Sequence, residues 1–218
     1  MRGRDIKRYG YDWAGLWLVY IPWHFPLHKD PTIQGASEKA EQAFKEQYPA
    51  IYQHLLQYKK QLSARNKAET GIRYEWYAMQ RWGANYSDDF NKPKIMWKII
   101  GCNINFCFDE QQMICNNAVN IMVGNKDNLI QFCGLMNSKL FDWYLKATTE
   151  AEVQGGGIQL YVTTLEDTLL KLDFPSSFTD KVRQRIENQF SDNELNNYVY
   201  KLYNLNPDEI AFIENNVR

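Results

Sequence analysis

Runs of apolar residues mark several short strands in this chain. The runs are rich in aromatic and β-branched residues and are bounded by turn-forming residues, which is the pattern of β-strands. They cover residues 15–22, 94–100, 103–109, 113–123 and 158–162. The segments between residues 94 and 123 follow one another closely, so we predict that they pair as antiparallel strands.

Apolar residues at three- and four-residue spacing predict the helices. Residues 37–65 have this spacing, and Pro49 divides them into two helices because proline lacks the amide donor that a helix interior needs. Ser37 suits the N-cap of the first helix. The apolar stripe of the second helix predicts core packing; it consists of Ile51, Leu55, Tyr58 and Leu62.

Helical spacing returns later in the chain and gives the fold class. It covers residues 127–146, with Asp127 as the expected cap and a break after residue 136, and it resumes from residue 179 to the end. We therefore predict an α+β fold with antiparallel β-sheets packed with helices and a small helical tail. The predicted division is a recognition domain over residues 1–178 and a helical appendage over residues 179–218.

Composition supports a folded protein with a substantial core. The chain has 218 residues, of which 44% are hydrophobic and 15% aromatic. No apolar run approaches the roughly 20 residues that span a bilayer, and the basic N-terminus is not followed by the apolar segment of a signal peptide. We expect a cytoplasmic protein.

The cysteines and histidines of this chain are not spaced as the ligands of a metal site are. The four cysteines lack paired C-x-x-C spacing, which favours buried free thiols; they are Cys102, Cys107, Cys115 and Cys133. His24 and His28 are separated by Pro26, which opposes a helix that would align them as ligands. We predict no metal site.

Charge is divided unevenly along the chain. The formal net charge is −1, yet residues 1–100 hold 16 Lys and Arg against 10 Asp and Glu, whereas residues 101–218 hold 9 against 16. A domain with one basic face shows such polarity. The excess of positive charge in residues 1–100 therefore permits a polyanionic partner despite the net charge of −1.

A window of basic, amide and aromatic residues over 73–98 is the strongest candidate for contact with nucleic acid. Arginine and glutamine suit base edges, lysine suits phosphates, and aromatic rings stack on bases or sugars. The candidates in this window are Arg73, Tyr74, Trp76, Tyr77, Gln80, Arg81, Lys92, Lys94 and Lys98. The alternative interpretation is that the aromatic residues form core and the lysines lie on a solvated face.

Two further segments add to the candidate set. The opening segment is basic and reads as an arm that contacts phosphates or faces a catalytic domain; its candidates are Arg2, Arg4, Lys7 and Arg8. The three glycines Gly155, Gly156 and Gly157 form a loop that lets backbone approach a partner closely. They lack the lysine and threonine of a phosphate-binding loop.

The order of several short motifs resembles a known family. GRDIKRY over residues 3–9, YPA over 48–50, LQYKKQLSAR over 56–65, WY over 76–77, PKI over 93–95, LMNSK over 135–139 and YKLYNL over 200–205 occur in that family's order. The chain resembles the TaqI-like C-terminal specificity domain, the target-recognition domain of type IIG restriction-modification enzymes and related adenine-specific DNA methyltransferases.

This resemblance implies recognition of a double-stranded DNA sequence on behalf of a methyltransferase, and sometimes of an endonuclease, on the same polypeptide. The chain has no Asn-Pro-Pro-Tyr or Asp-Pro-Pro-Tyr motif and no glycine-rich motif for S-adenosylmethionine. We therefore expect a module with no catalytic residues and no cofactor of its own. S-adenosylmethionine and Mg²⁺ are expected only in the catalytic region, which this chain lacks.

Two other functions stay open at this point. One is a metal-dependent hydrolase, whose carboxylates would be Asp5, Asp12, Glu75, Asp88 and Asp89. The other is a protein-interaction module in which the helices of residues 37–65 bind a partner. An apolar stripe left exposed on those helices would favour the second alternative.

Overall fold

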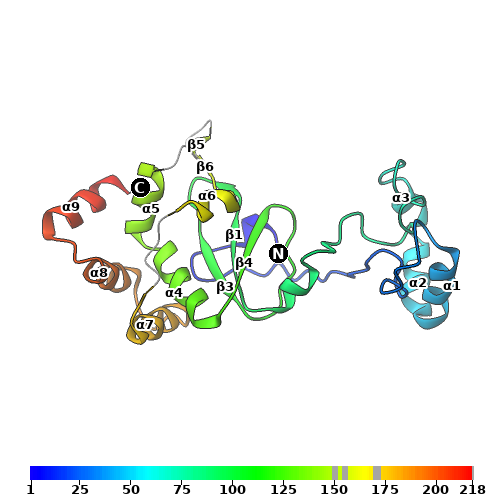
Figure 1. The fold of residues 1–218 in the computed structure, drawn as a ribbon, viewed down its shortest axis with the longest axis horizontal. Coiled ribbons are helices and arrows are strands. Elements are labelled where there is room, and N and C mark those ends of the chain that lie inside the picture. The colour runs from blue at the N-terminus through cyan, green and yellow to red at the C-terminus, as the bar shows by residue number, and fades with distance from the viewer. Residues whose placement is uncertain (149–151, 154–156, 169–172, 218) are drawn as a thin grey trace. The chain divides into compact units, whose positions relative to one another are not determined.

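The computed structural model describes residues 1–148, 152–153, 157–168 and 173–217, and it contains two compact units (Figure 1). The sheet unit comprises residues 1–15 and 88–218, and the helical unit comprises residues 16–87. The predicted α+β class with a helical C-terminal tail is confirmed. The units divide after residues 15 and 87, whereas the predicted boundary after residue 178 falls inside a helix.

A three-stranded antiparallel sheet is the centre of the sheet unit (Figure 1). Strand β1 (Lys94–Lys98) lies between β3 (Phe106–Asp109) and β4 (Val119–Val123). The register places Lys94 opposite Asp109. A second antiparallel sheet consists of β2 (Ile100–Gly101), β6 (Gly157–Gln159) and β5 (Glu152–Val153), in that order. The strands predicted from residue 94 to 123 therefore exist, although each is shorter than its apolar run.

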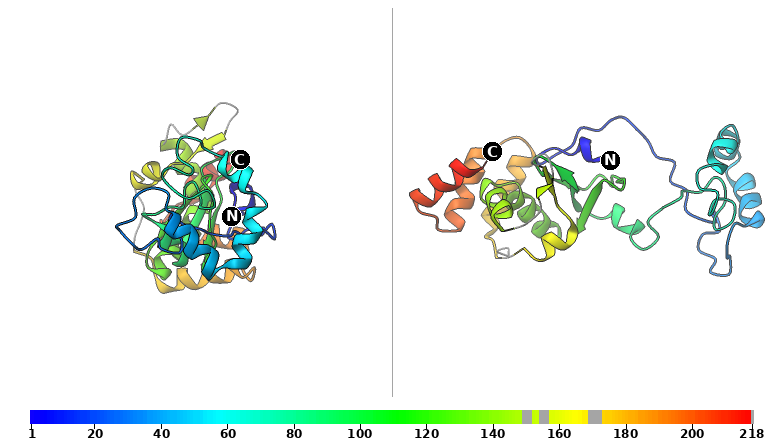
Figure 2. Two further views of the ribbon diagram at one scale, coloured as in Figure 1. Left: turned by 90° about the vertical axis from the view of Figure 1, so that its right-hand side faces the viewer. Right: turned by 90° about the horizontal axis from the view of Figure 1, so that it is seen from above.

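Helices follow the sheet and gather beside it (Figure 2). In chain order they are α4 (Lys126–Met136), α5 (Lys139–Thr148), α6 (Val162–Glu166), α7 (Ser176–Ile186), α8 (Asp192–Leu202) and α9 (Pro207–Asn216). Asn125, rather than the expected Asp127, caps α4, because its side chain accepts bonds from the amides of residues 127 and 128. Ser191 and Asn206 form capping boxes with Glu194 and Glu209, which explains where α8 and α9 begin.

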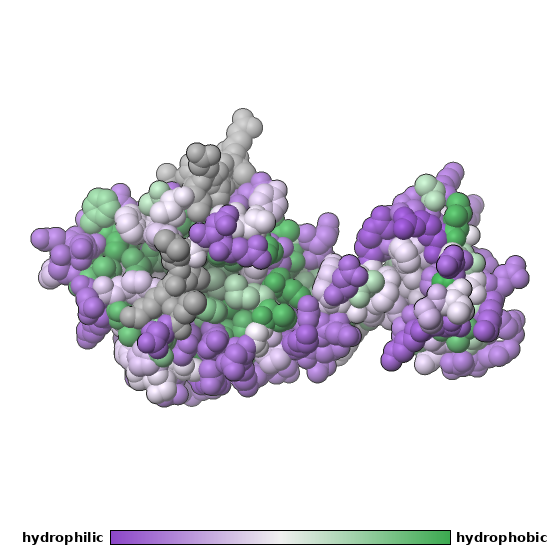
Figure 3. Space-filling model, in the orientation of Figure 1, coloured by the Kyte–Doolittle hydropathy of each residue, from purple (hydrophilic) through white to green (hydrophobic). Residues whose placement is uncertain are grey.

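The helical unit contains α1 (Glu38–Gln47), α2 (Pro49–Leu56) and α3 (Lys59–Ser63). The predicted Ser37 cap is confirmed, and Pro49 occupies the first turn of α2. Residues 15–22, in contrast, form no strand, so that prediction is wrong. An apolar run supplies the side chains of a strand but not the neighbouring backbone that a strand needs, and Trp17 in this run is 88% exposed. On the face shown in Figure 3, hydrophilic residues cover most of this unit.

Aromatic side chains fill the core of the helical unit. Phe44 of α1 lies at the centre and meets Phe25, Tyr52 and Tyr77 with ring centroids 5.5, 5.8 and 4.6 Å away. Ile21, Tyr74 and Trp76 complete the cluster. Because these bulky side chains come from irregular segments as well as helices, the unit forms a core without a sheet.

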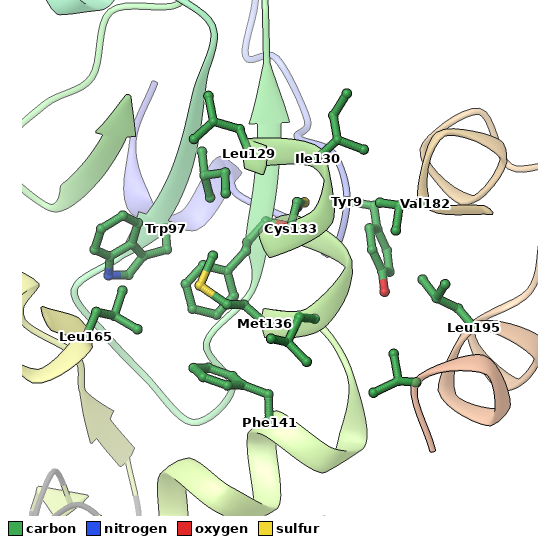
Figure 4. Close-up of a cluster of buried hydrophobic side chains, with 14 of the residues drawn as sticks. Tyr9, Trp97, Leu129, Ile130, Cys133, Met136, Phe141, Leu165, Val182 and Leu195 are labelled. Atoms are coloured by element: carbon green, nitrogen blue, oxygen red, sulfur yellow. Dashed lines mark hydrogen bonds between the residues drawn. The ribbon is translucent and has the colours of Figure 1, made fainter. Parts of the chain in front are cut away.

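Alternate residues of β1 enter two different cores of the sheet unit. Trp97 faces the helices and belongs to one cluster with Leu129, Cys133 and Met136 of α4. Figure 4 shows Trp97 on one side of α4 and Val182 of α7 and Leu195 of α8 on the other. Met96 points to the opposite face, where Ile6, Cys107 and Val119 bury it. The N-terminal segment therefore packs on the sheet. All four cysteines are free, as predicted, but Cys102 is exposed and Cys115 is only half-buried.

Gly134 allows α4 and α7 to approach closely. A Cβ atom at this position would overlap the side chain of Val182 and would lie 3.2 Å from Phe178 Cζ. The helices of the predicted tail thus share one core with the segment before residue 178. This contact explains why a glycine occurs inside an otherwise regular helix.

Candidate nucleic-acid interface

Two exposed arginines of the helical unit are held by one carboxylate. Glu69 Oε1 accepts a hydrogen bond from Arg73 Nη1 at 3.0 Å, and Glu69 Oε2 accepts one from Arg81 Nη1 at 2.9 Å. A further bond joins Arg81 Nη2 to Glu69 Oε1 at 3.3 Å. The side chains of Arg73 and Arg81 are 59% and 66% exposed, whereas that of Glu69 is 13% exposed. We call Arg73 and Arg81, held in this way, the arginine pair.

A tight turn over residues 66–74 fixes the position of Glu69. The carbonyl of Asn66 accepts bonds from the amides of Glu69 and Thr70, and the Asn66 side chain donates to Glu69 Oε2 at 2.9 Å. Gly71 has a φ of 79°, a conformation that glycine adopts without strain and that lets the chain reverse. The amide of Arg73 then donates to the carbonyl of Glu69 at 2.7 Å. Both partners of the first ion pair therefore belong to one closed turn.

Trp23 supports Arg73 from a second direction. The guanidinium of Arg73 lies over the Trp23 ring, 5.6 Å from its centroid, and Trp23 stacks on Tyr74 with centroids 4.9 Å apart. The Trp23 indole donates to the carbonyl of Met79 at 2.8 Å. Cation–π contact and the ion pair together restrict the rotamers of Arg73, so its guanidinium is oriented before any ligand arrives.

The ion pair between Glu69 and Arg81 stabilises the charged forms of both groups. The hydrogen bond from Arg81 lowers the pKa of the Glu69 carboxyl below its ordinary value, and the same bond raises the pKa of Arg81. The helical unit as a whole holds nine Lys and Arg against six Asp and Glu. An anionic partner would therefore be attracted to this unit.

The aromatic residues of the predicted window are core residues. Tyr74, Trp76 and Tyr77 are all buried. The Trp76 indole donates to Glu41 Oε1 at 2.7 Å, and the Tyr77 hydroxyl donates to the carbonyl of Phe25 at 2.9 Å. Burial raises the pKa of Tyr77. Their position is the one that the alternative interpretation expects, and we leave them out of the set that would contact DNA.

Gln80 lies beside the arginine pair in the sequence and contributes to it through its backbone. Its side chain is half-buried, and its carbonyl accepts a bond from Arg81 Nη1 at 3.0 Å. This bond adds a third restraint on the Arg81 guanidinium. Gln80 therefore stays in the candidate set.

The three lysines of the window occupy three different environments. Lys92 is exposed and pairs with Asp89 at 2.7 Å. Lys98 is half-buried, and its methylene chain lies over Gly101. Lys94 and its partner Asp109 have completely buried side chains, with Lys94 Nζ 2.5 Å from Asp109 Oδ2. A phosphate cannot reach Lys94 in this conformation, so we assign Lys94 a structural role instead of the predicted backbone contact.

Most cations of the N-terminal segment are engaged inside the sheet unit. Arg2 forms a bidentate pair with Asp5 at 2.9 and 2.8 Å. Arg8 donates to the carbonyl of Asn137 and to Asp192 Oδ2, so it joins this segment to α4 and α8. Lys7 is exposed and lies 3.4 Å from Asp12, and Arg4 is also exposed. Arg4 and Lys7 are thus the members of the predicted arm that solvent reaches most easily.

The glycine loop is described only in part. Gly155 and Gly156 lie outside the described residues, and Gly157 begins β6.

The carboxylates of the hydrolase alternative are largely engaged in contacts with other groups of the protein. Glu75, for example, is buried and accepts hydrogen bonds from the amides of His24 and Ser37. Within the described ranges no group of three or more His, Cys, Asp or Glu residues is placed to hold a metal ion.

A pocket of about 330 Å³ lies in the sheet unit, but several of its polar side chains have internal partners. Arg8 and Asn137 line it and bond to each other. Ser138 donates to the carbonyl of Leu135, and Lys139 pairs with Glu214. The pocket therefore offers a ligand few polar groups that are not already engaged.

Sequence reasoning missed Glu69, Asn66 and Trp23, which organise the arginine pair. The signal that would have revealed Glu69 is its spacing of four residues from Arg73, a distance that brings opposite charges together in helices and tight turns. Attention to cations alone overlooked the carboxylate between them. Nothing in the sequence indicates that Trp23 lies under Arg73, because the two residues are 50 positions apart.

Several motif residues have a structural explanation. Asn137, in the LMNSK segment, accepts a bond from the amide of Phe106 at 3.1 Å and donates to its carbonyl at 2.7 Å. It thus satisfies the backbone of β3 as a neighbouring strand would. Tyr9 of the opening motif donates its amide to the same carbonyl at 3.0 Å. These residues hold the sheet unit together.

Comparison with known proteins gives the family. No helix in the described ranges is long and apolar enough to cross a membrane. A search of curated protein sequences finds no match. The family profile of the TaqI-like C-terminal specificity domain, in contrast, matches residues 1–167 and so covers the helical unit and most of the sheet unit. The chain therefore belongs to the TaqI-like C-terminal specificity domain family, the specificity domains of restriction-modification enzymes.

Proposed function

We propose that this chain recognises a double-stranded DNA sequence for a type IIG restriction-modification enzyme and thereby directs methylation or cleavage. The catalytic methyltransferase or endonuclease region would lie outside this chain and would supply the sites for S-adenosylmethionine and Mg²⁺, in the cytoplasm. Family membership supports this function, and the observation that carries it is the exposed, preoriented arginine pair in the helical unit.

The candidate residues divide into two roles. Arg73, Arg81 and Gln80 carry the groups that suit base edges, because guanidinium and amide groups form paired hydrogen bonds with purines. Four exposed or half-buried cations of the candidate set lie in the sheet unit and suit the phosphate backbone; they are Arg4, Lys7, Lys92 and Lys98. Lys94 is buried, and Arg8 joins the N-terminal segment to Asn137 and Asp192, so these two cations belong to neither role.

Binding to random-sequence duplex DNA at rising salt concentration tests the proposal. The chain should bind at low salt and lose affinity as salt increases, because bound phosphates release counterions. Changing Lys92 and Lys98 to glutamate should weaken binding on every sequence. Lys201→Glu makes the same charge change at an exposed position of α8 and should weaken binding less. Absence of binding at the lowest salt concentration would contradict the proposed function.

A second candidate function, docking of a partner protein, is favoured by an exposed strip that consists of one residue of α2 and one residue on either side of it. Tyr48, Ile51 and Tyr58 follow one another at helical spacing and are 39%, 38% and 45% exposed. Two of them belong to the stripe for which core packing was predicted; only Leu55 and Leu62 of that stripe pack against the core. The expected partner is the catalytic region of the same polypeptide.

The two functions are separable by mutation. If the strip serves docking, Ile51→Ser and Tyr58→Ser should weaken binding to a separately produced catalytic region and leave DNA affinity unchanged. Arg73→Ala and Arg81→Ala should have the opposite pattern. Loss of DNA affinity in the strip variants, with the fold intact, would place the DNA surface on α2 instead.

A further inference from the structure

We propose that Glu69 is a positioning residue for sequence recognition, and that it holds Arg73 and Arg81 as one unit that reads guanines in the DNA. This inference rests on the proposed function and deepens it by naming the residue that organises the reading side chains and the base that they read.

The hydrogen bonds of the arginine pair leave enough donors for two guanines. A guanidinium has five N–H groups. Among the described residues Arg73 uses one, toward Glu69, and Arg81 uses three, toward Glu69 and the carbonyl of Gln80. Four donors of Arg73 and two of Arg81 are therefore available. A bidentate contact with guanine O6 and N7 needs two donors from each arginine.

The restraints on the pair favour a base edge over a phosphate. A guanidinium binds phosphate bidentately too, but the several equivalent phosphate oxygens accept it from many directions. The O6 and N7 atoms of guanine lie in one plane and need the guanidinium in one orientation. Glu69 and the Trp23 ring restrict Arg73, while Glu69 and the carbonyl of Gln80 restrict Arg81. Such restraint reduces the entropy lost on binding a planar acceptor pair.

The charge of Glu69 also favours contact with a base edge over contact with a phosphate. A carboxylate between two guanidiniums cancels one of their two positive charges, which weakens a purely electrostatic contact with phosphate. The carboxylate does not weaken a directed hydrogen bond to a neutral base edge in the same way. The arrangement therefore sacrifices general DNA affinity and retains orientation, as a sequence-reading site requires.

Selection from a duplex library with randomised positions tests the inference. The unaltered chain should enrich guanine at two positions of the bound pool. Arg73→Lys and Arg81→Lys should each lose the enrichment at one position, because lysine lacks the planar fork. Glu69→Gln should weaken the enrichment of guanine over other bases at both positions, by roughly tenfold at each. Its affinity for unselected duplex should stay equal or increase.

Two further variants separate positioning from charge and from stability. Glu46→Gln removes one negative charge from an exposed position of α1 and should leave both guanine preferences intact. Glu69→Asp keeps the charge but is too short to reach both arginines, and it should lose both preferences even if Glu69→Gln folds poorly. Thermal unfolding of each variant by circular dichroism confirms that the compared proteins are folded.

Each outcome has a distinct meaning. Enrichment by the unaltered chain that persists in Glu69→Gln and Glu69→Asp would overturn the role of Glu69 and leave the proposed function standing. Enrichment of bases other than guanine at the positions that depend on Arg73 and Arg81 would overturn the assignment of the base. No enrichment by the unaltered chain would overturn the proposed function, and this inference with it.

Discussion

Each unit contains cations that the sequence marks as candidates for DNA contact and that the structure pairs with a carboxylate. The environments of these cations in the two units are opposite. Lys94 and Asp109 in the sheet unit are completely buried. Arg73 and Arg81 in the helical unit are mostly exposed, although Glu69, which holds them, is not. Burial rather than residue type thus separates a cation that holds the fold from one that is able to meet a ligand.

The buried pair organises backbone around it. Lys94 Nζ also donates to the carbonyl of Phe90 at 2.8 Å, and Asp109 accepts bonds from the amides of Gln111 and Met113 at 3.0 and 3.1 Å. These hydrogen bonds of Lys94 and Asp109 all join groups of the sheet unit. The arginine pair, in contrast, retains donors that solvent reaches, which is the difference that the following predictions examine.

The largest effect is expected from Lys94→Met. This change leaves the Asp109 carboxylate buried without its cation, and it should lower the free energy of unfolding by about 3–5 kcal/mol. Urea unfolding measures the change. Lys92→Met, two positions before Lys94, is the matched control. It removes an exposed ion pair with Asp89 and should change the free energy of unfolding little. Equal stability of the two variants would contradict the structural role of Lys94.

A smaller effect is expected within the helical unit, where two glutamates six residues apart differ in burial. Glu75 is buried and accepts bonds from the amides of His24 and Ser37 at 2.7 and 2.9 Å, and its Oε1 lies 2.9 Å from His24 Nδ1. Glu75→Gln places an amide against these donors and should lower the free energy of unfolding by roughly 1–3 kcal/mol. Glu69→Gln should leave the urea midpoint nearly unchanged. The reverse order of stability would show that Glu69 is mainly structural.

The next effect concerns binding rather than stability. Arg73→Lys or Arg81→Lys should weaken binding to a duplex selected by the unaltered chain about 5- to 150-fold, since one bidentate base contact is lost. The urea midpoint should not change. Lys67→Ala, at an exposed position of the same turn, serves as the control and should have a smaller effect on the selected duplex. Fluorescence anisotropy with labelled duplex measures both affinities.

The smallest effect is expected for single phosphate contacts. Lys98→Ala or Lys92→Ala should weaken binding to all sequences alike and should reduce the slope of log affinity against log salt by about one. A change in base preference in either variant would move that lysine from the phosphate group to the base-reading group.

Local patterns predicted the elements of the sheet unit well. The apolar runs that form β1, β3 and β4 each extend over a few neighbouring positions, so they are visible in the sequence. The run over residues 15–22 misled because strand formation depends on a neighbouring strand that the run itself does not specify.

The candidate site was predicted in part. Arg73 and Arg81 were singled out by residue type, and the structure leaves both exposed. The burial of Tyr74 and Trp76 was one of two interpretations that the sequence left open, and the burial of Lys94 was not indicated, because burial depends on partners from distant segments. Lys94, for example, meets Asp109 only through the register of β1 and β3. Residue type alone does not distinguish a base-reading side chain from a buried one.

The central claim is that the exposed arginine pair, not the buried cation, reads the DNA. The most direct test compares the affinity of the double variant Arg73→Ala/Arg81→Ala for a selected duplex and for a scrambled duplex of the same composition. The account predicts a folded protein with the urea midpoint of the unaltered chain, whose affinities for the two duplexes have become equal. A double variant that is folded and still prefers the selected duplex as strongly as the unaltered chain would contradict it.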